Sequence, residues 1–169
     1  MYSRFIFSVV VTAVFFALYI PARADDTEEA NMALMKKFYS EVINMGKVDM
    51  MDQLCAADFV DHEKTPGFEP NLQGVKKMFK SFRASFPDLK FTVDMMLAKG
   101  DKVVSYITMS GTQKGPFMDM PASDKKFSVK AIDIIRFKDG KAVEHWGVTD
   151  SMAMMQQLGA FPEKGMVKK

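Results

Sequence analysis

The stretch that decides the fold is KKFSVKAIDIIRFKDGKAVEHWGV, residues 125–148. Apolar and polar residues alternate along 125–137 and again along 141–148, which is the period of a β-strand with one buried face. Lys138-Asp139-Gly140 lies between them and has the composition of a tight turn. The stretch therefore predicts a β-hairpin of two antiparallel strands.

Two further strands precede this hairpin. The same alternation covers residues 90–98 and 102–112, and Lys99-Gly100-Asp101 joins them as a second short turn. Residues 113–124 form a longer loop that is interrupted by glycine and proline. Together the four segments predict an antiparallel meander.

The segments around the meander have a helical period. Apolar residues recur at spacings of three and four over 27–44 and 71–86, a short helical turn is expected over 48–54, and a last helix over 151–158. Helices first and a curved sheet second predict an α+β domain whose helices cover one face of the sheet and enclose a pocket. We expect the domain to span residues 25–169.

The first 24 residues have the pattern of a secretory signal peptide. A basic start is followed by an apolar run over 5–20 and by Ala22-Arg23-Ala24, which has the small residues that signal peptidase accepts. An uncleaved membrane anchor is the alternative, and the acidic run after Ala24 favours cleavage. We expect a secreted or periplasmic protein that begins at Asp25, with no membrane association once the peptide is removed.

Composition excludes several classes of function. The chain is 48% hydrophobic and 26% charged, and two of its 23 basic residues but none of its 21 acidic residues lie in the first 24, so the remainder is formally neutral. No basic surplus indicates a nucleic-acid partner. One cysteine and two histidines cannot build a structural zinc site, and no phosphate-binding or dinucleotide motif is present, so no cofactor or metal is expected.

The methionine content is high, at 16 residues. A copper(I) site with thioether ligands is one interpretation of the methionine clusters. Most methionines sit at core spacing beside phenylalanines, however, where a flexible side chain fills gaps or lines an adaptable apolar pocket. We favour the second interpretation.

Asp133 is the clearest candidate for chemistry. In its strand it shares one face with five apolar residues, and an unpaired buried carboxylate would cost several kcal/mol. It is therefore either functional or paired with an arginine or lysine. The absence of any nucleophile motif leaves proton abstraction beside a carbonyl as the chemistry that such a carboxylate suits.

Two further residues stand at the ends of predicted elements. Asp150 lies where the last strand meets the last helix, so it is either a catalytic carboxylate at the pocket rim or a helix N-cap. His62 ends a short strand ahead of the breaker-rich loop 65–70, and it is either a proton-transfer group or a surface histidine. Strict alternation directs Trp146 into the pocket and His145 away from it. Further pocket candidates are Phe82, Gln113 and Tyr106.

The C-terminal half resembles a known family. AIDIIRFKDGKAVEHWGVTD at 131–150, with QQLG at 156–159 and FVDH at 59–62, closely resembles the SnoaL-like polyketide cyclases, or ester cyclases, of the nuclear transport factor 2-like superfamily. The resemblance implies a cone-shaped α+β barrel around a deep apolar cavity, usually dimerising through its sheet. It also implies cofactor-free aldol ring closure, with Asp150 as the acid/base residue and His62 in the cavity.

One position departs from the family pattern. Many members have Gly-Thr-His in the middle strand, where this chain has Gly111-Thr112-Gln113. Two functions therefore remain open. The first is cofactor-independent acid/base chemistry, aldol cyclisation or isomerisation, on an apolar or aromatic carbonyl compound, with Asp150, His62 and Asp133 as catalytic residues. The second is a periplasmic protein that binds such a compound without turning it over.

Overall fold

A five-stranded sheet forms the body of the molecule, in the order β1-β5-β4-β3-β2. The computed structural model describes residues 24–161; the expected signal peptide lies outside these residues except for Ala24. The strands are β1 (Cys55–Asp61), β2 (Lys90–Lys99), β3 (Lys102–Thr112), β4 (Lys126–Lys138) and β5 (Lys141–Thr149). Strands β2 to β5 form the predicted antiparallel meander, and β1 adds a parallel pairing to β5 at one edge.

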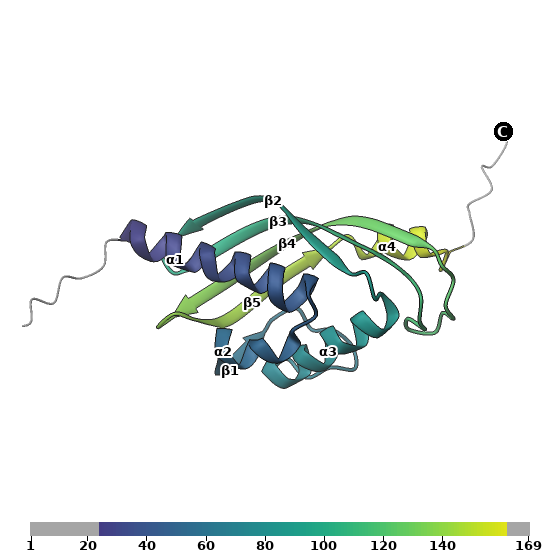
Figure 1. Ribbon diagram of the computed structural model, residues 1–169, viewed down its shortest axis with the longest axis horizontal. Helices are drawn as coiled ribbons and strands as arrows, with labels where there is room; N and C mark the ends of the chain where they lie inside the picture. Colours follow the sequence, from purple (N-terminus) through teal and green to yellow (C-terminus); the bar gives the residue numbers. More distant parts are fainter. Residues whose placement is uncertain (1–23, 162–169) are drawn as a thin grey trace, which may run out of the picture.

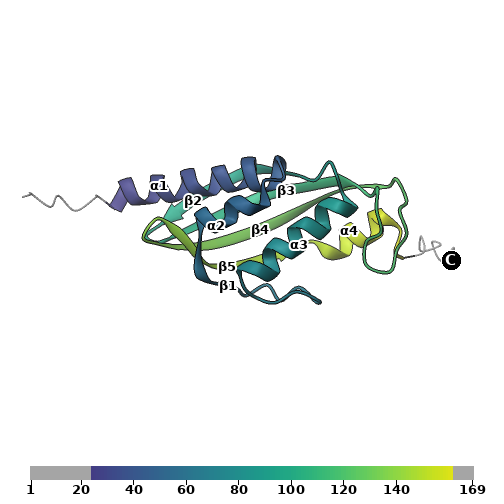
Figure 2. The ribbon, with the colours of Figure 1, turned by 60° about the horizontal axis from the view of Figure 1, so that its bottom comes forward.

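Helices lie against one face of the curved sheet (Figures 1 and 2). They are α1 (Ala24–Lys37), η1 (Phe38–Asn44), η2 (Val48–Met50), α2 (Met51–Leu54), α3 (Leu72–Ser85) and α4 (Ser151–Leu158). Among the described elements, none covers the opposite face of the sheet (Figure 1). The α+β class predicted from the sequence is confirmed.

Local signals explain where the helices begin and end. The side chain of Asn71 accepts a hydrogen bond from the backbone N–H of Gly74 and so caps α3, which ends just before Pro87. Gly159 takes the left-handed conformation that closes α4, with φ of 81°. The predicted first helix becomes α1 followed by the π-helical η1, whose wider turn brings Tyr39, Val42 and Ile43 together in the core.

The inner face of the sheet is apolar apart from a few positions. Cross-strand pairing places Asp133 of β4 between Ser105 of β3 and Gly147 of β5. The apolar residues that share its face are Phe127, Val129, Ala131, Ile135 and Phe137, and all five are buried. The predicted environment of Asp133 is therefore confirmed.

A β-bulge in β5 decides which side chains reach the interior. Arg136 pairs with Glu144, but the next residue, Phe137, pairs with Ala142, so Val143 is an extra residue in β5. The extra residue reverses the alternation. His145 and Gly147 consequently share the inner face with Ala142, and Trp146 faces outward, which corrects the expectation from strict alternation.

The outer face carries a continuous apolar row, which we call the outer row. Met95, Tyr106, Ile132 and Val148 are successive cross-strand partners from β2 to β5. Three of them are well exposed, and Val148 is the most exposed at 73%. Scattered apolar side chains are normal on a protein surface, whereas this row is continuous across four strands.

Candidate functional site

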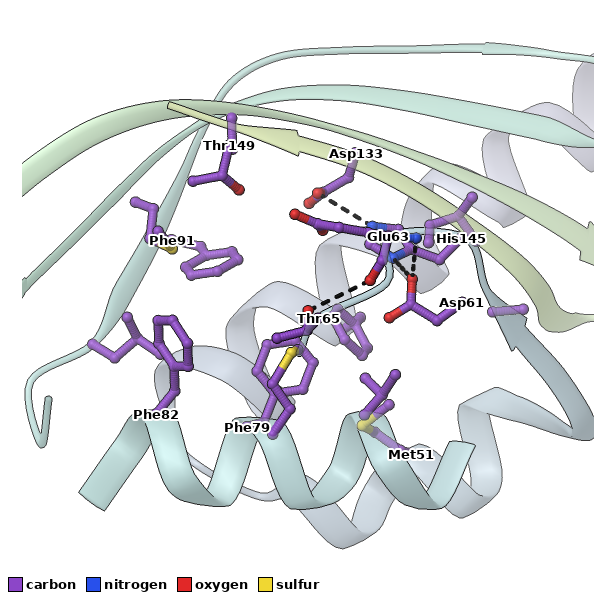
Figure 3. A pocket seen from close by; sticks show the side chains of 18 of the residues that line it. Met51, Asp61, Glu63, Thr65, Phe79, Phe82, Phe91, Asp133, His145 and Thr149 are labelled. Atoms are coloured by element: carbon purple, nitrogen blue, oxygen red, sulfur yellow. Dashed lines mark hydrogen bonds and ion pairs between the residues drawn. The ribbon is translucent and has the colours of Figure 1, made fainter. Parts of the chain in front are cut away.

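A cavity of about 370 Å³ lies between the inner face of the sheet and the helices. Its wall is mainly apolar, with phenylalanines and methionines from α3, the sheet and the 113–124 loop; Phe79, Phe82 and Phe91 are among them (Figure 3). Exposed lining residues, including Lys64, Pro66 and Met118, mark the side on which the cavity meets solvent. A cavity of this size and character suits a small, largely apolar molecule.

Three residues form a chain of hydrogen bonds at the polar end of this cavity (Figure 3). The Nδ1 atom of His145 lies 2.9 Å from Oδ1 of Asp61, and its Nε2 atom lies 3.4 Å from Oδ1 of Asp133. Asp61 comes from the end of β1, Asp133 from β4 and His145 from β5. The parallel pairing of β1 with β5 brings Asp61 and His145 together.

This arrangement holds His145 in its protonated form. Burial on its own lowers the pKa of His145, but hydrogen bonds to Asp133 and Asp61 and the charge of both carboxylates outweigh burial and raise the pKa to about 10. Both ring nitrogens then donate, one to each carboxylate. The cavity therefore contains an imidazolium at neutral pH.

Tyr39 holds the other side of Asp133. Its hydroxyl donates a hydrogen bond of 2.7 Å to Oδ2 of Asp133, so both carboxylate oxygens of Asp133 accept hydrogen bonds from protein groups. Burial and the nearby charge of Asp133 raise the pKa of Tyr39 well above its usual value. Tyr39 consequently remains a neutral donor, and the orientation of Asp133 is fixed from both sides.

Glu63 adds a third carboxylate to the polar end. It lies two residues beyond Asp61, at the start of the breaker-rich loop, and its backbone N–H donates to Oδ1 of Asp61 at 3.0 Å. Its side chain lies against Gly147, where a Cβ would overlap a carboxylate oxygen of Glu63. Burial raises the pKa of Glu63; the charge of His145 opposes the rise, and those of Asp133 and Asp61 add to it.

Only some of the catalytic and pocket residues predicted from the sequence line the cavity. Asp133 and Phe82 line the cavity. Asp150 is exposed and caps α4 by accepting a hydrogen bond of 2.9 Å from the backbone N–H of Ala153, which was the alternative interpretation of this residue. His62 is exposed and stacks on Trp146 with ring centroids 4.6 Å apart, away from the cavity, because the β5 bulge turns Trp146 outward.

The other two expected pocket residues also lie outside the cavity lining. Gln113 is fully buried, and both ends of its amide are used within the 113–124 loop: it donates to Pro121 O at 2.9 Å and accepts from Ser123 Oγ at 2.6 Å. Tyr106 belongs to the outer row, where the Lys130 ammonium lies 5.1 Å from its ring centroid. Gln113 therefore shapes a loop, and Tyr106 faces the opposite side of the sheet.

Four residues of the site were not among the sequence-based candidates: Tyr39, Asp61, Glu63 and His145. Tyr39 belongs to an apolar helical stripe, which indicates a core position and no chemistry. The direction of His145 depends on the β5 bulge, which strict alternation does not predict. Asp61 and Glu63 flank His62 in the sequence, so Phe59-Val60-Asp61-His62 did mark the correct segment. The signal that was available was the pair of acidic residues on either side of the histidine.

The described part of the chain offers no group of three His, Cys, Asp or Glu side chains that could hold a metal ion. Over the same residues, no helix is long and apolar enough to span a membrane. What the site provides is an imidazolium, three carboxylates and a tyrosine hydroxyl around one end of an apolar cavity. Such a set can transfer protons and stabilise a developing oxyanion.

Comparison with protein families gives a match over most of the chain. Residues 33–158 match the family model described as SnoaL-like polyketide cyclase. The aklanonic acid methyl ester cyclase of Streptomyces sp. (strain C5) is 30% identical over 131 residues, which cover 70% of this chain and 76% of that relative. The nogalonic acid methyl ester cyclase of Streptomyces nogalater is 24% identical over 118 residues, which cover 69% of this chain and 88% of that relative.

Solved structures support the same relationship. TsrD from Streptomyces laurentii superimposes with a TM-score of 0.71 at 31% identity, over 79% of this chain and 97% of that protein. A polyketide cyclase homologue from Bacillus cereus ATCC 10987 superimposes with a TM-score of 0.67 at 30% identity, over 77% of this chain and 80% of that protein.

Proposed function

Because the chain belongs to the SnoaL-like polyketide cyclase family, we propose that it catalyses cofactor-independent ring closure of an apolar, aromatic carbonyl compound inside the cavity. The observation that carries the proposal is the position of His145, between Asp61 and Asp133 at the end of an apolar cavity. In an aldol closure, the substrate loses a proton beside a carbonyl and its oxygen gains negative charge. A fixed cation next to that oxygen stabilises the charge.

The hydrogen-bond lengths indicate how His145 acts. The bond to Asp61 is short at 2.9 Å and positions the ring, whereas the 3.4 Å bond from Nε2 to Asp133 is weak. The Nε2 proton is therefore available to a substrate oxygen that approaches from the cavity. Asp133 acts as a positioning residue, because it keeps the imidazole charged and oriented.

The charges of the cavity favour a neutral substrate. Three carboxylates and one imidazole line it, and Lys64 at the exposed side is the sole lysine or arginine among the described lining residues. A free carboxylate on the substrate would be repelled by this set, whereas its ester would not. The two curated relatives are named as cyclases of methyl esters, which agrees with this expectation.

The proposal is tested with the two methyl esters that the relatives' names specify. Purified protein is incubated with nogalonic or aklanonic acid methyl ester, and the cyclised product is measured by chromatography. His145→Gln should lower kcat by about 10²–10³-fold, as the loss of one oxyanion donor does, while His62→Gln should leave kcat unchanged. Binding of both esters without turnover would instead support the non-catalytic binding protein.

Two further proposals concern the whole protein. We propose that residues 1–24 direct export, and truncating them leaves the contacts of α1 intact: Glu28 still accepts a hydrogen bond of 2.6 Å from the N–H of Gly100. N-terminal sequencing should return Asp25, and Met1 on membrane-bound material would contradict export.

We also propose a homodimer in which the partner covers the outer row.

A further inference from the structure

We propose that Glu63 is the general base that removes the proton beside the substrate carbonyl; this inference rests on the ring-closure function proposed above. The proposed function requires a base, and three carboxylates line the polar end of the cavity. Their hydrogen bonds distinguish them. The base must have a carboxylate oxygen that is free to contact the substrate.

Asp61 and Asp133 are already engaged by protein groups. Asp61 is only 5% exposed, and it accepts from His145 and from the N–H of Glu63. Asp133 accepts from Tyr39 on one oxygen and from His145 on the other. Both carboxylates are therefore used to hold His145 and Tyr39 in place.

The Glu63 carboxylate differs from both. Among the described residues, none donates a hydrogen bond to it, although the side chain lines the cavity. Figure 3 shows Glu63 beside His145 and Asp133, at the same end of the cavity. The groups that face it are His145 from β5, Asp133 from β4 and Asp61 from β1. Burial raises the pKa of Glu63 above that of an ordinary glutamate.

Gly147 provides the space that Glu63 occupies. A Cβ at this position would overlap a Glu63 carboxylate oxygen and would lie 2.9 Å from Cε1 and Nε2 of His145. The glycine lets the carboxylate lie directly against the strand, next to the imidazolium edge. A substrate carbonyl that accepts from Nε2 of His145 therefore places its neighbouring C–H close to Glu63.

The reaction is balanced without a further reactant. Glu63 takes the proton as the C–H bond breaks, and the electron pair enters an enolate whose oxygen faces the Nε2–H of His145. The enolate carbon then forms a bond to a second carbonyl carbon of the same molecule. The resulting alkoxide takes the proton back from the Glu63 carboxyl, which ends the cycle ionised as it began.

The test separates proton removal from ring closure. Aklanonic acid methyl ester is incubated with the protein in D₂O; deuterium uptake is followed by mass spectrometry and ring closure by chromatography. Glu63→Gln should slow both by about 10²–10⁴-fold, the usual contribution of a general base. Glu69→Gln, an exposed acid of the same loop that does not line the cavity, is the matched control and should behave as wild type.

Chemical rescue distinguishes a base from a positioning residue. Formate should restore deuterium uptake to Glu63→Ala, and the pH profile of the rescued variant should follow the ionisation of formate. Asp133→Asn should not respond to formate, because its loss disturbs the charge and orientation of His145.

The outcomes identify which proposal fails. If wild type neither exchanges nor cyclises the ester, the proposed function is overturned and Glu63 has no proton to remove. If wild type does both and Glu63→Gln matches Glu69→Gln, only the assignment of Glu63 is overturned. Loss of activity in Glu63→Gln that formate cannot restore in Glu63→Ala would also overturn it.

Discussion

At the scale of single residues, His145 is the side chain whose charge most depends on its surroundings. An exposed histidine is mostly neutral at pH 7, whereas Asp61 and Asp133 keep this one protonated. Burying two carboxylates costs free energy, which the charge of the imidazolium and the hydrogen bonds from His145 and Tyr39 offset. The site is therefore a set of mutually dependent charges.

This dependence predicts how stability varies with pH. The pKa of His145 rises from 6.5 in the unfolded chain to about 10 in the fold, so its contribution is complete below about pH 6.5 and is lost as the pH rises toward 10. We expect the free energy of unfolding, measured in urea, to fall steadily from pH 6.5 to 8.5. The measurement stops at pH 8.5 because burial also raises the pKa of Cys55, to about 12. At higher pH the thiol ionises more readily in the unfolded chain than in the fold, which lowers the free energy of unfolding further.

Variants of the two histidines provide the control. His145→Gln should remove most of the decline between pH 6.5 and 8.5, and His62→Gln should retain it. An unchanged decline in His145→Gln would show that the imidazolium does not contribute to the folding equilibrium in this range.

Substitution of Asp150 should change stability and leave catalysis intact, because Asp150 is exposed and caps α4. Asp150→Ala should destabilise the fold by about 1 kcal/mol, and Asp150→Asn should restore most of that stability because asparagine caps equally well. Both variants should retain kcat on the methyl esters. A large loss of kcat in Asp150→Asn, with stability intact, would return Asp150 to the acid/base role that the family resemblance implies.

At the scale of elements, the sequence predicted most of the fold. The strand β3 and the helix α4 have the predicted bounds, and the other strands of the meander differ by one residue at their ends, since alternation and turn residues are local signals. The parallel pairing of β1 with β5 could not be read locally, because it joins segments separated by most of the chain. The site was predicted less well than the fold, because the direction of His145 depends on one bulge that strict alternation does not anticipate.

One connection between elements makes a further prediction. The side chain of Asn44, the last residue of η1, donates to Phe91 O at 3.0 Å and accepts from Phe91 N–H at 2.8 Å, so it pairs with the free edge of β2 as a neighbouring strand would. Asn44→Ala should destabilise the fold by about 1–3 kcal/mol in urea unfolding, because both backbone groups lose their partner. Ser40→Ala, which removes an exposed hydrogen bond within the helix, should cost less than about 0.5 kcal/mol.

At the scale of the whole molecule, the two faces of the sheet have different environments. The helices lie against the inner face of the sheet (Figure 2), where the cavity is. The outer face carries the outer row. Burial of such a row against a second copy would remove it from water and leave the cavity of each copy unchanged.

The proposed dimer is tested by light scattering of the mature chain. Wild type should have twice the mass of one chain, and Val148→Lys should shift the mass toward the monomer by placing a charge within the covered surface. Met45→Lys is the control, because Met45 is also an exposed apolar residue but belongs to the turn after η1. A monomeric wild type would contradict the dimer.

The bulge at Val143 also limits how this protein can change in length. If β5 became regular without losing a residue, strict alternation from Ala142 would exchange its two faces: Trp146 would fill the cavity and His145 would turn to solvent. Deletion of Val143 has the opposite effect, because Glu144 then follows Ala142 in the ladder and His145 stays on the inner face. Among related chains that retain the reaction, this segment should therefore either keep its bulge or be one residue shorter.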